Sequence, residues 1–276
     1  MVPPVLDMAS VRQRPGPAIL ADVRWYLDGR SGQRAYEDGH IPGAIFVDLD
    51  KWLAGDARAG GGRHPLPSPE TFAAGMVALG IGDNDTVIGY DDQGGVIAAR
   101  LVWMLRVTGH EAALLDGGLQ GYEGPLEKGR PVPAEATGPG ISRAHFTARP
   151  WPAERLAGID DAANRANVVI DARSADRYHG RDEHIDPRAG HIPGAVSLPC
   201  RDNLDQSGRF LQVPALRDRF SKAGVTDGER VVSYCGSGVT ACHNLLALEL
   251  CGLGQGRLYP GSWSEYAASA GRPVAT

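Results

Sequence analysis

The sequence has few cysteines and no long apolar stretch. The four cysteines form no Cys-x-x-Cys pair, so they indicate neither a zinc site nor a disulfide framework, and we expect reduced thiols and no bound metal. No apolar run reaches the roughly 18 residues that a membrane helix requires, and residues 1–17 lack the apolar core of a signal peptide. We therefore expect a soluble, cytoplasmic protein with no membrane partner.

An excess of positive charge is also absent. Lys and Arg total 28 against 33 Asp and Glu, a formal net charge of −5, which argues against a nucleic-acid partner. The acidic excess lies in the first half of the chain, and the second half is close to neutral. Because a few local cations outweigh the global sum at contact distance, the second half can still receive an anionic ligand.

The 276 residues contain an internal repeat. The pentapeptide His-Ile-Pro-Gly-Ala (HIPGA) begins at His40 and again at His191, each time after a glycine, and an Asp-x-Arg triplet precedes each copy. The same order of landmarks in both halves indicates a duplication. We therefore expect two domains, residues 1–140 and 141–276, joined by a proline-rich linker that begins near residue 124.

Short apolar runs alternate with helical patterns in each half. Such alternation is typical of a parallel sheet that helices cover on both faces, so the expected fold class is α/β. The expected strands are residues 18–22, 86–90, 168–171 and 231–234, and the expected helices are residues 68–79, 98–106, 214–223 and 244–251.

Cys235 lies between the expected strand 231–234 and an expected helix, in the segment Cys-Gly-Ser-Gly-Val-Thr-Ala. Ligands bind to open parallel sheets at the carboxyl ends of their strands, and Gly236 and Gly238 allow the backbone to curl so that its N–H groups point inward. Inward amides and a helix start favour the thiolate over the thiol, which makes Cys235 a candidate nucleophile. The alternative is that Cys235 is an ordinary buried small residue.

A cysteine phosphatase would carry an arginine six positions after the cysteine, where this chain has Ala241. The segment that begins at Cys235 instead resembles the active-site loop of the two-domain rhodanese-type sulfurtransferases, in particular their 3-mercaptopyruvate branch. The resemblance implies tandem rhodanese-like domains, a persulfide carried on Cys235, and no metal or organic cofactor. The loop residues expected to contact the substrate are Gly236, Gly238, Val239 and Thr240.

The two halves differ where the repeat places Asp91 opposite Cys235, at an offset of 144 residues. A carboxylate cannot carry sulfur, and the adjacent acids Asp91 and Asp92 repel an anion. We therefore expect domain 1–140 to be a catalytically silent copy that forms one wall of a cleft, which the resemblance also implies.

Features that both halves share are expected to be structural. The Asp-x-Arg triplets contain Arg24 and Arg173, and each suits an ion pair that ties a strand to a loop. The HIPGA histidines, His40 and His191, suit hydrogen-bonded turn residues rather than general bases, because only one half needs chemistry.

Arginines are more frequent before the second HIPGA segment than before the first. A planar guanidinium can hold a carboxylate through two parallel hydrogen bonds. By resemblance, the two substrate-binding arginines of the family correspond to Arg177 and Arg188, and Arg181 is an alternative to Arg177. These arginines could equally form a solvated run of charge with the acids between them.

The resemblance also implies a relay across the cleft. In the 3-mercaptopyruvate branch, a serine of the loop is thought to join a histidine and an aspartate of the first domain, which correspond here to Ser237, His64 and Asp50. Such a relay could orient the donor carbonyl or supply a proton to a departing enolate. The alternatives are a plain turn residue at Ser237 and an exposed His64.

The expected function is the transfer of a sulfane sulfur from 3-mercaptopyruvate, a small anionic donor, to cyanide, a small thiol or a thioredoxin-like dithiol. One alternative is thiosulfate as the donor, although this dianion should prefer cations beside the cysteine, and Gly236-Ser237 offers none. Another is a non-enzymatic module that carries sulfur for a partner protein.

Overall fold

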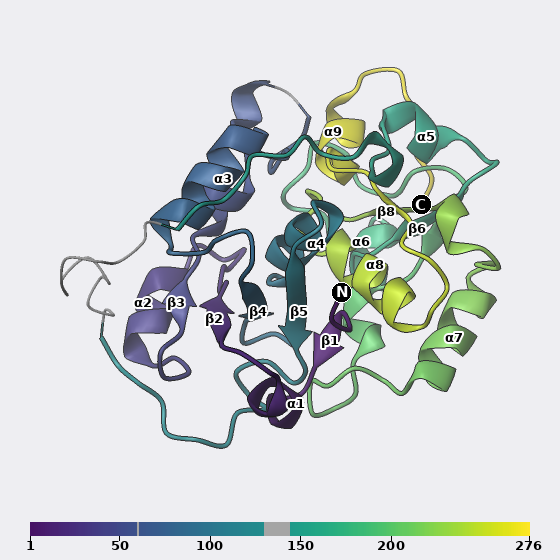
Figure 1. Ribbon diagram of the computed structural model, residues 1–276. Helices are drawn as coiled ribbons and strands as arrows, with labels where there is room; N and C mark the ends of the chain where they lie inside the picture. Colours follow the sequence, from purple (N-terminus) through teal and green to yellow (C-terminus); the bar gives the residue numbers. More distant parts are fainter. Residues whose placement is uncertain (60, 130–143) are drawn as a thin grey trace.

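Two α/β halves lie side by side in the computed structural model, which describes residues 1–59, 61–129 and 144–276 (Figure 1). The strands are β1 (Val5–Leu6), β2 (Ala18–Asp22), β3 (Ile45–Phe46), β4 (Thr86–Tyr90), β5 (Glu111–Leu115), β6 (Val168–Asp171), β7 (Val196–Ser197), β8 (Val231–Tyr234) and β9 (Arg257–Leu258). Over the described residues, β1-β5-β4-β2-β3 form one parallel sheet and β7-β6-β8-β9 form another. The predicted α/β class with tandem parallel sheets is confirmed.

Helices cover both faces of each sheet. They are α1 (Met8–Gln13), α2 (Gly32–Asp38), α3 (Pro69–Ala78), α4 (Ala99–Val107), α5 (Ile159–Ala163), α6 (Ala175–Tyr178), α7 (Val213–Lys222), α8 (Ala241–Leu250) and α9 (Ser262–Ala268). In β4, Val87 joins the core cluster that contains Trp103 of α4, whereas Ile88 joins a separate cluster on the opposite face. In β8, the adjacent residues Val231 and Val232 divide between two clusters in the same way. Two-sided burial explains why these strands are continuous apolar runs.

The predicted strands coincide with β2, β4, β6 and β8. The helix predicted at residues 244–251 differs from the observed one, because α8 already begins at Ala241, directly after the cysteine loop. The parallel register pairs Asp171 of β6 with Tyr234 at the end of β8. Cys235 therefore leaves the sheet at its carboxyl edge, where the sequence predicted a ligand site.

The structure describes only part of the segment predicted as a linker. Glu127 pairs with His40 in an antiparallel bridge, and the corresponding His191 of the second half pairs with Ala275 near the end of the chain. The predicted domain boundary near residue 140 lies outside the described residues.

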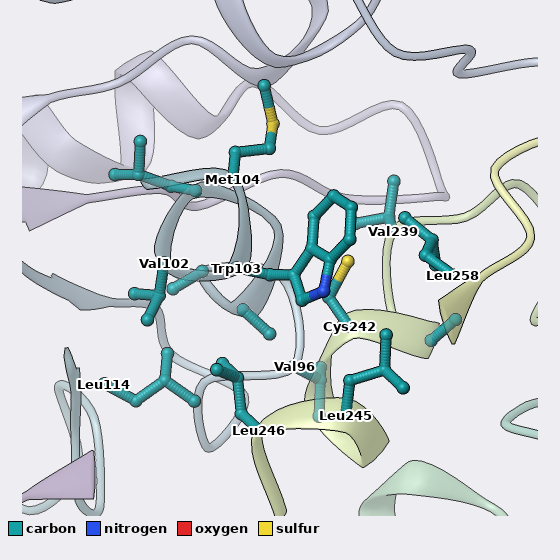
Figure 2. Packing of buried hydrophobic residues seen from close by; sticks show 14 of the residues in the cluster. Val96, Val102, Trp103, Met104, Leu114, Val239, Cys242, Leu245, Leu246 and Leu258 are labelled. Carbon is teal, nitrogen blue, oxygen red and sulfur yellow. The ribbon is translucent and has the colours of Figure 1, made fainter. Parts of the chain in front are cut away.

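One apolar core joins the two halves, and α4 and α8 contribute to it from opposite sides (Figure 2). Val102 and Trp103 of α4 belong to the same buried cluster as Cys242, Leu245 and Leu246 of α8. Burial of each large apolar side chain contributes about 1.5–3 kcal/mol. Because α8 directly follows the cysteine loop, this packing holds the loop of the second half against the first half.

The features that both halves share make structural contacts. Arg24 pairs with Asp22 at 2.7 Å and Arg173 pairs with Asp171 at 2.6 Å, both in buried positions. Each guanidinium also donates to the carbonyl oxygen of the glycine that precedes its HIPGA segment. The HIPGA histidines bond to backbone carbonyls and stack on tyrosine rings. These contacts tie each strand end to the following turn, as a structural role requires.

Candidate active site

Cys235 is buried but has polar partners. Its N–H donates to Oγ of Ser262 at 3.1 Å, and its carbonyl accepts the N–H of Trp263 at 3.0 Å, so the start of α9 fixes its backbone. Its Sγ accepts the N–H of Gly238 at 3.1 Å. The residue is 2% exposed, so the sulfur is buried, with a main-chain donor directed at it.

The loop after Cys235 offers further main-chain donors. Gly238 has a φ of 82°, and a Cβ at this position would lie 2.4 Å from the carbonyl oxygen of Pro260, so only glycine fits. Within the described part of the chain, the structure records no acceptor for the backbone N–H groups of Gly236, Ser237, Val239 and Thr240. A loop with several unused amides beside a sulfur suits an anion.

The corresponding loop of the first half already contains an anion. The carboxylate of Asp91 is fully buried and accepts four backbone hydrogen bonds of 2.7–2.9 Å. The donors are Gln93, Gly95, Ile97 and Ala98. Burial raises the pKa of Asp91, and the four N–H groups oppose that rise by stabilising the carboxylate. At the offset of 144, the unused amides of Ser237 and Val239 correspond to two of these donors, so the same loop geometry binds a negative group in the silent half.

We expect Asp91→Asn to lower the free energy of unfolding by about 2–4 kcal/mol, because an amide NH₂ would face N–H groups in a buried site. Urea unfolding followed by circular dichroism measures this loss. Asp92→Asn is the matched control, since Asp92 accepts the hydroxyl of Tyr26 rather than the loop amides. Equal losses for the two variants would contradict the carboxylate's role as the anion of this loop.

The structure brings the three predicted relay residues together. Nδ1 of His64 lies 2.7 Å from Oγ of Ser237, and Nε2 of His64 lies 3.5 Å from Oδ1 of Asp50. Asp50 lies on the short π-helical turn Leu49–Leu53, and its other oxygen accepts the indole N–H of Trp25 at 3.1 Å. The hydrogen bond to His64 lowers the pKa of Asp50, so this carboxylate stays ionised beside the imidazole. A hydroxyl next to the cysteine is thereby connected to an imidazole and an ionised carboxylate from the other half.

Two guanidinium groups converge on the residue after Cys235. A Cβ on Gly236 would lie 3.0 Å from Nη2 of Arg63 and 3.1 Å from Nη1 of Arg177. Among the described residues, the structure records no acceptor for either of these two nitrogens. Arg177 comes from α6 in the second half and Arg63 from the first, so the pair spans the two halves.

Two buried carboxylates hold the opposite sides of these guanidinium groups. Asp186 pairs with both Arg63 and Arg177, and Glu183 accepts from Arg177 at 2.8 Å. Burial raises the pKa of Asp186, and the nearby guanidinium groups act against this rise. The hydrogen bond from Arg177 lowers the pKa of Glu183 despite the opposing effect of burial. The carboxylates orient the arginines and leave one nitrogen of each directed at the loop.

The prediction for Arg188 requires correction, and Arg63 was missed. The guanidinium of Arg188 donates to four backbone carbonyl oxygens after the middle of α9, so it stabilises that helix end instead of facing the loop. Arg181 pairs with Asp176 and is 62% exposed at the surface. Arg63 takes the second position over the loop. The one available sequence signal was its place directly before His64.

The other cysteines are poor nucleophiles. Burial raises the pKa of Cys200 and Cys242 to about 12 and that of Cys251 to about 11. The described residues include no cluster of three or more His, Cys, Asp or Glu side chains that could hold a metal ion. In the part of the chain that the structure describes, every helix falls short of what crossing a bilayer requires.

Fold and site together define a duplicated α/β protein in which one of two related loops carries a cysteine and the other a buried carboxyl group. The rhodanese-like domain family matches residues 9–124 and 153–269, one domain in each half. The chain therefore belongs to the rhodanese-like family, which confirms the resemblance found in the sequence.

Similar proteins agree on the class of reaction. The chain is 41% identical to a probable 3-mercaptopyruvate sulfurtransferase of Pseudomonas aeruginosa, with 94% of this chain and 92% of that protein covered. It is 37% identical to a putative thiosulfate sulfurtransferase of Mycobacterium tuberculosis, with 97% and 94% covered. The structure of 3-mercaptopyruvate sulfurtransferase from Leishmania major superposes with a TM-score of 0.83 at 31% identity, with 98% and 75% covered. The protein is a sulfurtransferase.

Proposed function

We propose that this sulfurtransferase takes sulfur from 3-mercaptopyruvate, holds it as a persulfide on Cys235 and passes it to a thiophilic acceptor. The observation that carries the proposal is the hydrogen-bonded chain from Ser237 through His64 to Asp50, directly beside the cysteine loop. The names of several similar proteins support the same donor.

In the first half-reaction, the thiolate of Cys235 attacks the sulfur of the donor. The new S–S bond forms as the C–S bond breaks, and the electron pair of that bond leaves on carbon as pyruvate enolate. Arg63 and Arg177 hold the donor carboxylate with the two nitrogens directed at Gly236. Ser237 polarises the carbonyl, and the His64 side of the relay provides the proton that converts the enolate to pyruvate.

In the second half-reaction, the acceptor attacks the outer sulfur of the persulfide. The S–S bond breaks and the thiolate of Cys235 is regenerated, with the loop amides stabilising the negative charge at each stage. Cyanide, a small thiol and a thioredoxin-like dithiol all satisfy this chemistry. We propose a small thiol or such a dithiol as the physiological partner, and no metal or organic cofactor takes part in any step.

Thiosulfate is a second candidate donor, and one observation favours it. The sequence argument against thiosulfate was that the loop lacks nearby cations, but Arg63 and Arg177 lie over Gly236. The relay still favours 3-mercaptopyruvate. Sulfite is a stable anion when it departs from thiosulfate, whereas an enolate must gain a proton, so only the latter leaving group benefits from Ser237 and His64.

Steady-state rates with each donor, with cyanide as acceptor, test the proposal. We expect the higher kcat/KM with 3-mercaptopyruvate, and intact-mass spectra should show one added sulfur atom on Cys235 before the acceptor is added. A preference for thiosulfate would overturn the donor assignment. Absence of turnover and of added sulfur with both donors, together with capture of a partner protein, would support a non-enzymatic module instead.

The two converging arginines should control donor binding more than the chemical step. We expect Arg63→Gln to raise KM for 3-mercaptopyruvate about tenfold to hundredfold, because it removes a charged hydrogen bond to the carboxylate, with little change in kcat. Arg181→Gln is the control, since Arg181 is exposed and pairs with Asp176. A similar KM in the two variants would show that Arg63 does not contact the donor.

A further inference from the structure

Arg100, on α4 of the silent half, is a buried cation without a carboxylate partner. Its side chain is fully buried, and its guanidinium donates to three backbone carbonyl oxygens, those of Leu53, Gly238 and His64, at 3.0–3.2 Å. Within the described residues, no salt bridge to Arg100 is present. The other strongly buried arginines each have one: Arg24 with Asp22, Arg106 with Glu249 and Arg173 with Asp171. An unpaired buried charge is costly, so a compensating anion is expected near it.

Two of the three carbonyl groups that Arg100 holds belong to residues of the candidate site. Gly238 accepts from Arg100 through its oxygen and donates through its N–H to Sγ of Cys235, so a single residue separates the cation from the sulfur. His64 accepts from Arg100 through its carbonyl and bonds to Ser237 through its ring. The cation therefore lies beneath both the cysteine loop and the relay.

The anion that could compensate Arg100 is the one on Cys235. Arg100 interacts electrostatically with the thiol of Cys242, to which it also hydrogen-bonds, and then with that of Cys235. Burial raises the pKa of Cys242 to about 12 despite its contact with Arg100, so Cys242 stays neutral. Other titratable groups near the loop, among the residues that the structure describes, include Arg63, Arg177, His64 and Cys200. Arg63 and Arg177 are already paired with carboxylates, and the pKa of Cys200 is raised to about 12.

The silent half provides an internal comparison. At the offset of 144, Gly94 corresponds to Gly238, and its carbonyl oxygen lies 3.3 Å from Nε2 of His243 on α8. Each half thus places a side chain of its own helix on the loop glycine of the other half. Burial lowers the pKa of His243 to about 3, so the silent loop meets a neutral ring. Burial also lowers the pKa of Arg100, but a guanidinium starts so high that the cysteine loop still meets a cation. This difference between the two loops fits the negative group that each contains. The carboxylate of Asp91 receives its hydrogen bonds from backbone amides alone, so the silent loop needs no cation.

We propose that Arg100 is the buried counter-charge of the anion on Cys235, first as thiolate and then as persulfide, supplied to the cysteine from the other half. This role rests on the proposed function, in which Cys235 carries the sulfur. Arg100 acts as a positioning residue, since it reaches the sulfur through the peptide of Gly238 and fixes the backbone of His64. The silent half then contributes charge to the site as well as a wall.

Alkylation of Cys235 by iodoacetamide in the full chain, followed by mass spectrometry across a range of pH, tests this role. We expect Arg100→Met to slow alkylation at neutral pH about tenfold or more and to move the half-maximal rate about one to two pH units higher, because the thiolate loses its cation. Arg100→Lys keeps the charge and should restore most of the rate. Arg106→Met is the control on the same helix, since it breaks the buried pair with Glu249 but lies away from the loop carbonyls.

An Arg100→Met protein that is folded and has the wild-type pH profile of alkylation would overturn the inference. If that variant does not fold, Arg100→Gln replaces it in the same alkylation series, and a wild-type pH profile in that variant would likewise overturn the inference. Alkylation requires no sulfur transfer, so failure of the proposed function, which is seen as no added sulfur with either donor, is a separate result.

Discussion

Cys235→Ser is expected to abolish sulfur transfer from every donor, with a fall in kcat/KM of at least about 10⁴-fold. A serine hydroxyl is not ionised at neutral pH and cannot form the S–S bond on which both half-reactions depend. The loop amides and the arginines remain in the variant, so donor binding should persist while turnover stops. Steady-state kinetics measures the loss, and intact-mass spectra should show no added sulfur after incubation with 3-mercaptopyruvate.

Cys251→Ala serves as the comparison for this variant. Cys251 follows α8 at the end that is remote from the loop, and burial raises its pKa to about 11. We expect its replacement to affect stability through lost packing and to leave sulfur transfer within about twofold. Added sulfur on the Cys235→Ser protein would identify another thiol as the carrier and would contradict the assignment.

Much of the fold could be predicted because local patterns determine it. Apolar runs such as the one in β8 are buried on both faces, and the repeated HIPGA and Asp-x-Arg segments make the same contacts in each half. The start of α8 was predicted too late, since the loop passes into the helix without a capping side chain that would mark its first residue.

The active site was predictable where its residues are contiguous or lie in a recognisable segment. Cys235 and Ser237 lie in one loop, and the resemblance identified His64 and Asp50, but the sequence could not place the pair beside Ser237. Arg177 and Arg188 lie in the same arginine-rich segment, so local composition favoured Arg188 as a carboxylate binder as strongly as it favoured Arg177. Whether a guanidinium meets a substrate or the free carbonyls of a helix end depends on tertiary packing.

Charges supplied by one half to the other could not be predicted at all. Arg63 and Arg100 are distant in sequence from Cys235, and Arg100 lies in a buried helix whose residues other than Arg100 and Arg106 are apolar, so the helix reads as core. They reach the cysteine loop because α4 and α8 pack against each other across the two halves. The charge distribution around the cysteine loop is therefore a property of the interface between the halves.

Ser237→Ala and Asp50→Asn are expected to lower kcat for 3-mercaptopyruvate about 10²-fold or more, because the enolate loses its proton source. Both variants should keep the arginines in place, so KM should change little. The hydrogen bond with His64 lowers the pKa of Asp50, so the carboxylate remains ionised below its ordinary titration range. The loss in Asp50→Asn should therefore be the same from neutral to mildly acidic pH.

Turnover with thiosulfate distinguishes a role of this relay in proton transfer from a purely structural role. Sulfite departs without needing a proton, so each relay variant should retain thiosulfate turnover within about threefold, while activity with 3-mercaptopyruvate falls. Asp48→Asn is the matched control, since Asp48 caps the same π-helical turn through the N–H of Lys51 and lies outside the hydrogen-bonded chain. Parallel losses with both donors in Ser237→Ala would mean that the serine shapes the cysteine loop. A loss confined to 3-mercaptopyruvate would place the serine and the imidazole from the silent half in the protonation of the leaving group.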